Sequence, residues 1–231
     1  MVDRDSGSDI ILGNNACTGF VVKTVYIHGK AAHAAAAPHL GSNALNAAGL
    51  GMSALGMIRE TFQEKDCIRV HPYIRKGGEA INIVPSEVVV DMMVRAKTKD
   101  VMEAGSERVD NCFRGAAMAI GCTVDIVNTQ GYLPCPERLP DDVMLECCKL
   151  LPESLDVRPI TAGSCNTAST DVGDLFAVMP VLNFTFGGSA GALHSKDFSI
   201  SDKNGAHIVP AKLMALMTYR LLKNGGYEAI K

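Results

Sequence analysis

The expected fold is decided by the stretch Thr18-Gly19-Phe20-Val21-Val22-Lys23-Thr24-Val25-Tyr26-Ile27-His28-Gly29-Lys30. This stretch is rich in β-branched residues, partly alternates and closes on glycine, so it predicts a strand. After the turn-like residues 38–41, the run Asn43–Phe62 is rich in Ala, Leu and Met and has no charge before Arg59. We expect a helix there, with Ser42 as its N-cap and with burial on more than one face.

The residues that follow complete a repeating pattern of strands and helices. Strands are expected at Cys67–Lys76 and Val84–Ala96, joined through Gly77-Gly78. A helical stripe covers Lys99–Gly121, with Gly121 as its stop, and Thr123–Asn128 supplies a fourth strand. The order β-α-β-β-α-β predicts a ferredoxin-like sandwich, in which two helices cover one face of a four-stranded sheet. Residues 18–131 are therefore expected to form one domain.

Three closely spaced prolines, at residues 134, 136 and 140, indicate a domain boundary, and a second pattern of secondary structure begins there. We expect alternating helices and strands at Asp141–Leu151, Val157–Thr161, Val178–Phe186 and Val209–Lys223, with a polar loop at Gly163–Thr170. Residues 132–231 hold few strands of their own for an α/β domain. They are expected to need a partner segment, placed upstream of Met1.

Composition excludes several classes of protein. With 47% apolar and 20% charged residues, the 231-residue chain is expected to be globular. A net charge of −3, with no basic cluster among aromatics, argues against a nucleic-acid partner. The longest apolar stretch, Ala44–Ile58, is too short for a membrane span, and the polar residues 1–5 are unlike a signal peptide. We expect no membrane association and a cytoplasmic location.

The eight cysteines form no Cys-x-x-Cys pair, and none lies beside a histidine at ligand spacing. Buried, reduced thiols are the expected state.

Two of the six histidines lie in unusual surroundings. His33 is flanked by small residues within residues 29–41, which would let another surface approach it. The same alanine-rich residues are also typical of a helix start, in which case the histidine would have no functional role. His194 lies in the glycine-rich residues 187–198, directly after a predicted strand. Loops at strand ends hold functional sites in α/β domains, so His194 could be a ligand or a catalytic residue. The alternative is a solvated loop histidine without such a role. The other four, His28, His39, His71 and His207, have ordinary surface or core explanations.

Two polar residues flank the strand predicted at 84–96. An Arg95 guanidinium suits a carboxylate, and an Asn82 amide can donate to a developing oxyanion. A turn asparagine and a salt-bridged surface arginine are the plainer alternatives. The segment Ser169-Thr170-Asp171-Val172-Gly173-Asp174 reads as a helix start with Asp171 capping backbone amides.

Several motifs occur together in one order. They are Gly-Lys-Ala-Ala-His-Ala at 29–34, Pro-His-x-Gly-x-Asn-Ala-Leu at 38–45, Asn-Ile-Val-Pro at 82–85 with Val-Arg at 94–95, Ser-Thr-Asp-Val-Gly-Asp at 169–174 and Leu-His-Ser-Lys-Asp-Phe at 193–198. Because it has these motifs in this order, the chain resembles the M20 metallopeptidases, and among them the amidohydrolases related to aminobenzoyl-glutamate and N-acyl-amino-acid hydrolases. The resemblance runs from Thr18 to the C-terminus.

The resemblance implies a zinc-peptidase-like α/β catalytic domain interrupted by the ferredoxin-like lid, with homodimers formed through the lid. It implies a two-metal centre, of zinc or manganese, that activates water to attack an amide, with a glutamate as general base. His194 is then a metal ligand. His33 is the catalytic lid histidine that stabilises the oxyanion in a partner subunit, and Asn82 and Arg95 contact the oxyanion or the substrate carboxylate.

The family's other metal ligands belong to a half that would precede residue 1, and a zinc site needs three or four protein ligands. Residues 1–17 are interpreted as a remnant of that half. The sequence thus predicts a hydrolase of amide bonds in N-acyl amino acids or peptide-like small molecules, truncated and inactive alone. Two alternatives are a non-enzymatic dimerisation or ligand-binding module of a degenerate paralogue, and a missing half supplied by another polypeptide.

Overall fold

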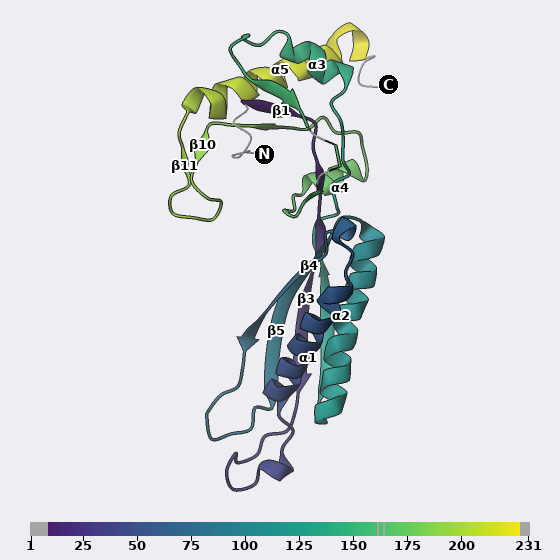
Figure 1. Cartoon of the computed structure of the whole chain (residues 1–231), viewed down its shortest axis with the longest axis vertical. Coiled ribbons are helices and arrows are strands. Elements are labelled where there is room, and N and C mark those ends of the chain that lie inside the picture. Colours follow the sequence, from purple (N-terminus) through teal and green to yellow (C-terminus); the bar gives the residue numbers. More distant parts are fainter. Residues whose placement is uncertain (1–8, 161, 164, 227–231) are drawn as a thin grey trace. The chain divides into compact units, whose positions relative to one another are not determined.

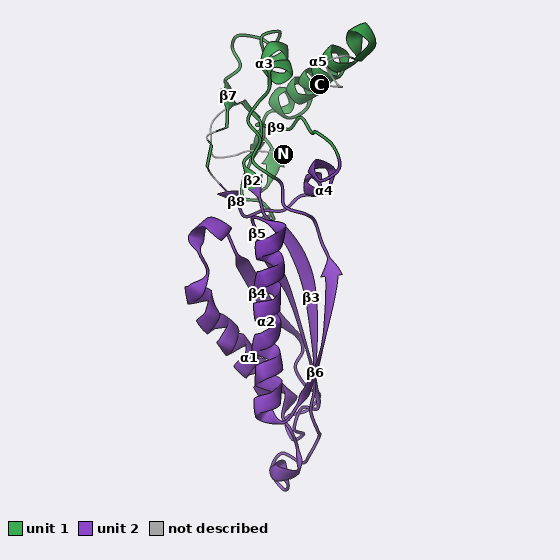
Figure 2. Ribbon diagram, turned by 90° about the vertical axis from the view of Figure 1, so that its right-hand side faces the viewer, with its two compact units in different colours: residues 1–16, 136–164, 179–231 green, residues 17–135, 165–178 purple. Residues whose placement is uncertain are grey.

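The computed structural model describes residues 9–160, 162–163 and 165–226, which form two compact units (Figure 1 and Figure 2). Unit 1 contains residues 1–16, 136–164 and 179–231, and unit 2 contains residues 17–135 and 165–178. Within the expected remnant at 1–17, residues 1–8 lie outside the described part, as does Thr161 at the end of one predicted strand.

Unit 2 is built on a four-stranded antiparallel sheet with two helices on one face (Figure 1). Its main elements are β3 (Gly19–His28), α1 (Ala44–Ile58), β4 (Arg69–Lys76), β5 (Glu87–Ala96), α2 (Lys99–Ile120) and β6 (Thr123–Gln130). The strand order β4-β5-β3-β6 leaves β4 and β6 at the edges. The expected ferredoxin-like lid is confirmed, with strand and helix ends shifted by a few residues.

Helix α1 corrects two details of the sequence reading. Its N-cap is Asn43, whose Oδ1 accepts from the backbone N of Leu45 and of Asn46 at 2.9 and 3.1 Å, whereas Ser42 pairs through its backbone with Lys30. The helix also buries one stripe rather than several faces. That stripe consists of Ala44, Ala47, Ala48, Gly51 and Leu55. The opposite side is exposed and uncharged.

A close approach of α1 to α2 explains why a glycine lies in the buried stripe. A Cβ added to Gly51 would come within 2.6 Å of Phe113 Cδ1, whereas one added to Gly49 would meet no atom within 4 Å. We expect Gly51→Ala to destabilise the lid by about 1–3 kcal/mol through overpacking, despite alanine's higher helix propensity. The matched change Gly49→Ala is expected to stabilise it by up to about 1 kcal/mol. Urea unfolding of both variants tests this, and equal effects would contradict it.

Helix α2 is capped at both ends and tied to the sheet by one buried ion pair. Thr98 Oγ1 accepts from Val101 N at 3.4 Å, and Gly121 ends the helix with φ 74°, as the sequence predicted. Inside the core, the fully buried Lys23 donates to Asp110 Oδ1 at 2.6 Å and to Asn128 Oδ1 at 2.7 Å. These bonds join β3 to α2 and to β6.

Unit 1 has a three-stranded sheet of order β7-β1-β9, in which β1 pairs parallel with β7 and antiparallel with β9. Its elements are β1 (Ile10–Leu12), α3 (Asp142–Cys148), β7 (Val157–Pro159), β9 (Phe184–Phe186), β10 (Ser189–Ala190), β11 (Ser199–Ile200) and α5 (Val209–Leu222). Its core gathers Ile10, Leu12, Met144, Phe184 and Leu213 with their neighbours. The mixed α/β class is confirmed.

Two expectations in the second half of the chain were wrong in detail. The strand predicted at 178–186 is only β9, because Val178 is 75% exposed and follows the short helix α4 (Val172–Phe176). The loop predicted at 163–170 contains the short strand β8 (Cys165–Asn166), which pairs with β2 (Ala16–Cys17).

Short helical turns complete the chain, at Pro38–Leu40, Arg59–Thr61, Glu64–Asp66, Asn204–Ile208 and Lys223–Gly226. Among the described helices, none is long and apolar enough to cross a membrane.

Candidate functional site

His33 and Asn82 lie together at one end of the lid sheet, in the loops that follow β3 and β4. His33 forms a bridge with Ile83, and Ala34 N donates to Asn82 O at 3.0 Å. Both residues are exposed. The backbone N–H groups of Ala35 and Ala36 donate to His33 Nδ1 at 3.2 and 3.1 Å. Because Nδ1 accepts, the proton of the neutral ring belongs on Nε2, which is left as an outward hydrogen-bond donor.

Arg95 is held near the opposite end of β5. Its Nη1 donates to Ser169 Oγ at 2.9 Å and its Nη2 contacts Met93 Sδ at 3.4 Å. The guanidinium also lies over the Phe20 ring, 5.5 Å from the centroid. No carboxylate pairs with Arg95 among the residues that the structure describes. The surface salt bridge considered as its alternative role is therefore absent there.

The lid does not bring these residues to one place within a single chain. Strand β5 begins at Glu87, which pairs with His28 next to the loop of His33, and Arg95 follows eight residues later. At about 3.4 Å per residue in an antiparallel strand, the two ends are separated by roughly 27 Å. A small molecule in contact with Arg95 therefore could not also contact the same chain's His33.

Ser169 is a contact that the sequence reading missed, because the segment was interpreted as a helix start. Thr18, which is 1% exposed, donates to Thr167 O at 2.9 Å and lies 3.3 Å from Ser169 Oγ. Asp171 precedes α4 without capping it. The Ser-Thr-Asp motif was visible, but its partner Arg95 is 74 residues away.

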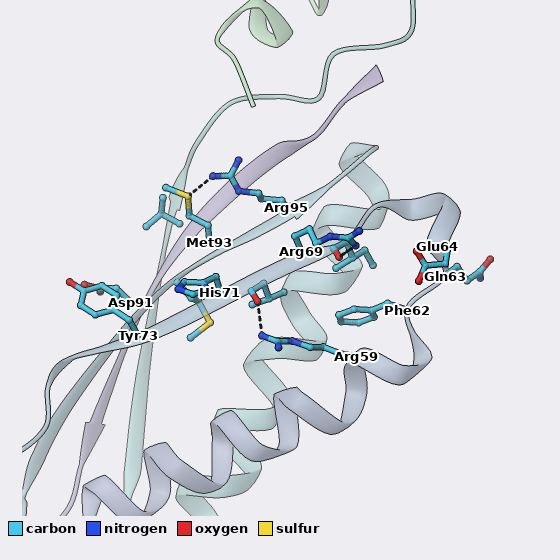
Figure 3. Close-up of a pocket in the computed structure, with 14 residues that line it drawn as sticks. Arg59, Phe62, Gln63, Glu64, Arg69, His71, Tyr73, Asp91, Met93 and Arg95 are labelled. Atoms are coloured by element: carbon cyan, nitrogen blue, oxygen red, sulfur yellow. Dashed lines mark hydrogen bonds between the residues drawn. The ribbon is translucent and has the colours of Figure 1, made fainter. Parts of the chain in front are cut away.

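A cavity of about 730 Å³ lies along β4, and Arg95 is at the margin of this cavity (Figure 3). Its polar and aromatic lining includes Arg59, Phe62, Glu64, Arg69, His71, Tyr73, Asp91 and Arg95. Asp91 pairs with Arg75 at 3.1 Å, while Arg59 and Arg69 donate to the backbone carbonyls of Val70 and Ile68 at 2.6 and 2.8 Å. The three arginines of the lining outnumber its two carboxylates, Glu64 and Asp91, so the cavity can accept an acidic group.

His194 lies in unit 1, in the exposed loop between β10 and β11, with φ 61°. Over residues 9–160, 162–163 and 165–226, no three His, Cys, Asp or Glu side chains are grouped so that they could hold a metal ion. The described donors therefore do not fit the two-metal centre that the resemblance implied.

Comparison with known proteins shows what the lid is similar to. Residues 15–118 match the family model M20_dimer, described as a peptidase dimerisation domain. Over 103 residues the chain is 44% identical to a Xaa-Arg dipeptidase of Mus musculus, an alignment that covers 45% of this chain and 23% of the relative. Over 98 residues it is 36% identical to a p-aminobenzoyl-glutamate hydrolase chain of Escherichia coli, covering 42% and 20% of the two chains.

Solved structures extend the similarity in fold to both units. An aminobenzoyl-glutamate utilization protein of Klebsiella pneumoniae has a TM-score of 0.69 at 19% identity, covering 97% of this chain and 54% of that one. A putative aminohydrolase of Staphylococcus aureus has the same TM-score at 17% identity, covering 94% and 56%. The chain thus spans just over half of these structures, and its alignments span less than a quarter of the two curated relatives. Residues 15–118 thus match the M20 peptidase dimerisation domain, and over part of its length the chain is similar to a Xaa-Arg dipeptidase and to a p-aminobenzoyl-glutamate hydrolase subunit.

Proposed function

We propose that this chain supplies the lid, and part of the catalytic domain, of a metal-dependent hydrolase of amide bonds in N-acyl amino acids or peptide-like small molecules. The match of residues 15–118 to the dimerisation domain carries the proposal. The proposed enzyme would use zinc or manganese, with His194 as one of the metal ligands.

Two lid sites would act on such a substrate. The Arg95 guanidinium, oriented by Ser169 and by the Phe20 ring, presents a planar donor fork to a carboxylate. At the other end, His33 Nε2–H and the Asn82 amide would donate to the oxygen that gains charge as the amide carbon becomes tetrahedral.

A homodimer formed through β4 would unite the two ends. Strand β4 runs from Arg69, which pairs with Arg95, to Lys76, beside the loop of Asn82. When two copies of an edge strand pair antiparallel about a twofold axis, the end of one lies beside the start of the other. The partner's His33 and Asn82 would then approach this chain's Arg95, which supports the trans role expected of His33.

Strand pairing alone would hold such a dimer weakly. The carbonyl of Val70 already accepts from Arg59 Nη2, and Pro72 has no N–H to offer. The exposed side of α1, with Leu50 at 43% and Met57 at 71% exposure, supplies uncharged surface near the same edge. Helix packing would therefore carry much of the association.

Charge placed on that side of α1 should disrupt the dimer. We expect Leu50→Glu combined with Met57→Lys to shift the chain toward monomer at tens of micromolar, on the order at which weak contacts are assayed. Met118→Lys is the matched control, because Met118 is 80% exposed on α2. Sedimentation equilibrium tests this, and equal behaviour of the two proteins would count against the α1 interface.

A chimera tests the proposed function. Residues 15–118 would replace the dimerisation domain of the mouse Xaa-Arg dipeptidase, to which they align at 44% identity over 103 residues. If the lid is catalytically competent, the chimera should hydrolyse the dipeptide substrate of its host. A chimera that is dimeric and loaded with metal but inactive would instead favour the second candidate, a non-enzymatic dimerisation or ligand-binding module. That candidate is supported by the match of residues 15–118 to a dimerisation domain.

A further inference from the structure

Two buried cysteines face each other where the chain enters and leaves the main segment of unit 2. Cys17 is the first residue of that segment and Cys135 the last. Cys17 N donates to Cys135 O at 3.0 Å, and Cys135 N donates to Cys17 O at 3.1 Å. This reciprocal pair is a hydrogen-bonded position of an antiparallel ladder, at which the Cα atoms lie about 5.5 Å apart. Directly opposite side chains also lie on the same face.

The spacing suits a covalent bond between the sulfurs, since disulfides join Cα atoms about 4.4–6.8 Å apart. The two thiols already interact. The hydrogen bond from Cys135 lowers the pKa of Cys17, and burial opposes this. The same bond, followed by burial, raises the pKa of Cys135. Cys17 is therefore the sulfur that ionises first.

We propose that Cys17 and Cys135 are a redox-sensitive pair that closes as a disulfide across the base of the lid when hydrogen peroxide reaches it. The Cys17 thiolate attacks one peroxide oxygen and breaks the O–O bond, which leaves a sulfenic acid on Cys17 and releases hydroxide. The Cys135 sulfur then attacks the Cys17 sulfur, and the S–O bond breaks. The protons that the two thiols lose convert both leaving hydroxides to water. Two thiols are oxidised, and one peroxide is reduced to two waters.

The geometry favours a reversible bond. Opposed Cβ atoms in a ladder lie about 4.5–5.5 Å apart, whereas a disulfide draws them to about 3.8 Å. The two strands must therefore close slightly, and a strained disulfide is reduced more readily. The oxidant must also be small, because Cys17 is 4% and Cys135 1% exposed. The bond would tie the two strands through which the lid is joined to the rest of the chain.

A second cysteine pair in unit 2 provides a comparison. Cys67 and Cys165 are hydrogen-bond partners and are more exposed than the first pair. Burial, and then the bond to Cys67, raise the pKa of Cys165 to about 12, so this sulfur is held as a thiol. Exposure alone therefore predicts oxidation at Cys67 and Cys165, whereas the ladder geometry predicts it at Cys17 and Cys135.

Oxidation of the 231-residue chain distinguishes these outcomes. The protein would be treated with hydrogen peroxide, then alkylated and digested without reduction, and cross-linked peptides would be mapped by mass spectrometry. We expect a Cys17–Cys135 peptide, a loss of two thiols, and a thermal midpoint raised by about 5–10 °C that dithiothreitol reverses. Cys17→Ser and Cys135→Ser should each abolish all three changes, whereas Cys122→Ser, at a buried thiol without this partner, should keep them.

Mapping of the unaltered chain tests the pair even if a serine variant does not fold, and Cys17→Ala and Cys135→Ala serve as second variants. A Cys67–Cys165 cross-link with Cys17 and Cys135 still reduced would overturn the proposal. So would the absence of any cross-link at peroxide concentrations that leave the circular dichroism spectrum unchanged.

Discussion

Replacing Asp110 with alanine is expected to lower the unfolding free energy of the lid by about 3–5 kcal/mol. Lys23 is fully buried, and its ammonium donates to Asp110 Oδ1 at 2.6 Å. Without the carboxylate, a buried charge keeps only the neutral amide oxygen of Asn128, 2.7 Å away. The penalty is large because it comes from the stranded charge rather than from the loss of the pair itself.

The double variant Lys23→Met with Asp110→Leu separates these two contributions. An apolar replacement of similar volume removes both charges, so it should recover most of the stability that Asp110→Ala loses. The exposed pair of His28 with Asp125, at 3.1 Å, is the matched control, and Asp125→Ala should change stability little. Guanidinium unfolding of the lid measures all three. A double variant no more stable than Asp110→Ala would contradict the account.

The lid fold could be read from the sequence because its local signals agree. The strand pattern at β3, the glycine stop at Gly121 and the stripe of α2 all point to the same arrangement. Lys23 could not be placed in this way, since an isolated lysine in a strand normally indicates the solvent side. Its burial depends on Asp110, 87 residues away, and no local pattern encodes that pairing.

The second half of the chain was harder to predict because its strands are short. Strands β1, β7 and β9 have three residues each, too few to show a period of two. The sheet joins segments more than 140 residues apart, as in the pairing of Ile10 with Val157. The apolar run near Val178 was therefore read as one strand, although tertiary pairing selects only its last three residues.

The candidate site was predicted as separate residues, not as an arrangement. The motifs identified His33, Asn82 and Arg95, and the structure adds that the first two lie together, far along the sheet from the third. Ser169 was missed as the partner of Arg95 because the contact spans 74 residues. The length of β5 separates the two ends within one chain, and this separation makes Arg95 a suitable second residue for a test of the trans role that the sequence predicted for His33.

Two impaired lids should complement each other if His33 acts in trans. In the chimeric dipeptidase, His33→Ala is expected to lower kcat by about 10²–10³ through loss of an oxyanion donor, with KM and metal content little changed. Arg95→Ala is expected to raise KM by about tenfold or more through loss of a charged hydrogen bond to the substrate carboxylate.

In a mixed dimer, the site that uses Arg95 of the first chain receives His33 from the second. Pairing His33→Ala with Arg95→Ala therefore leaves one intact site and one doubly damaged site. Random mixing places about half of the chains in mixed dimers, so roughly a quarter of the unsubstituted activity should return at low substrate concentration. A cis arrangement damages both sites of every mixed dimer and restores nothing. Subunit exchange, confirmed by co-purification of two affinity tags, must accompany the assay. Exchanged dimers without recovered activity would show that His33 and Arg95 do not share a site across the interface.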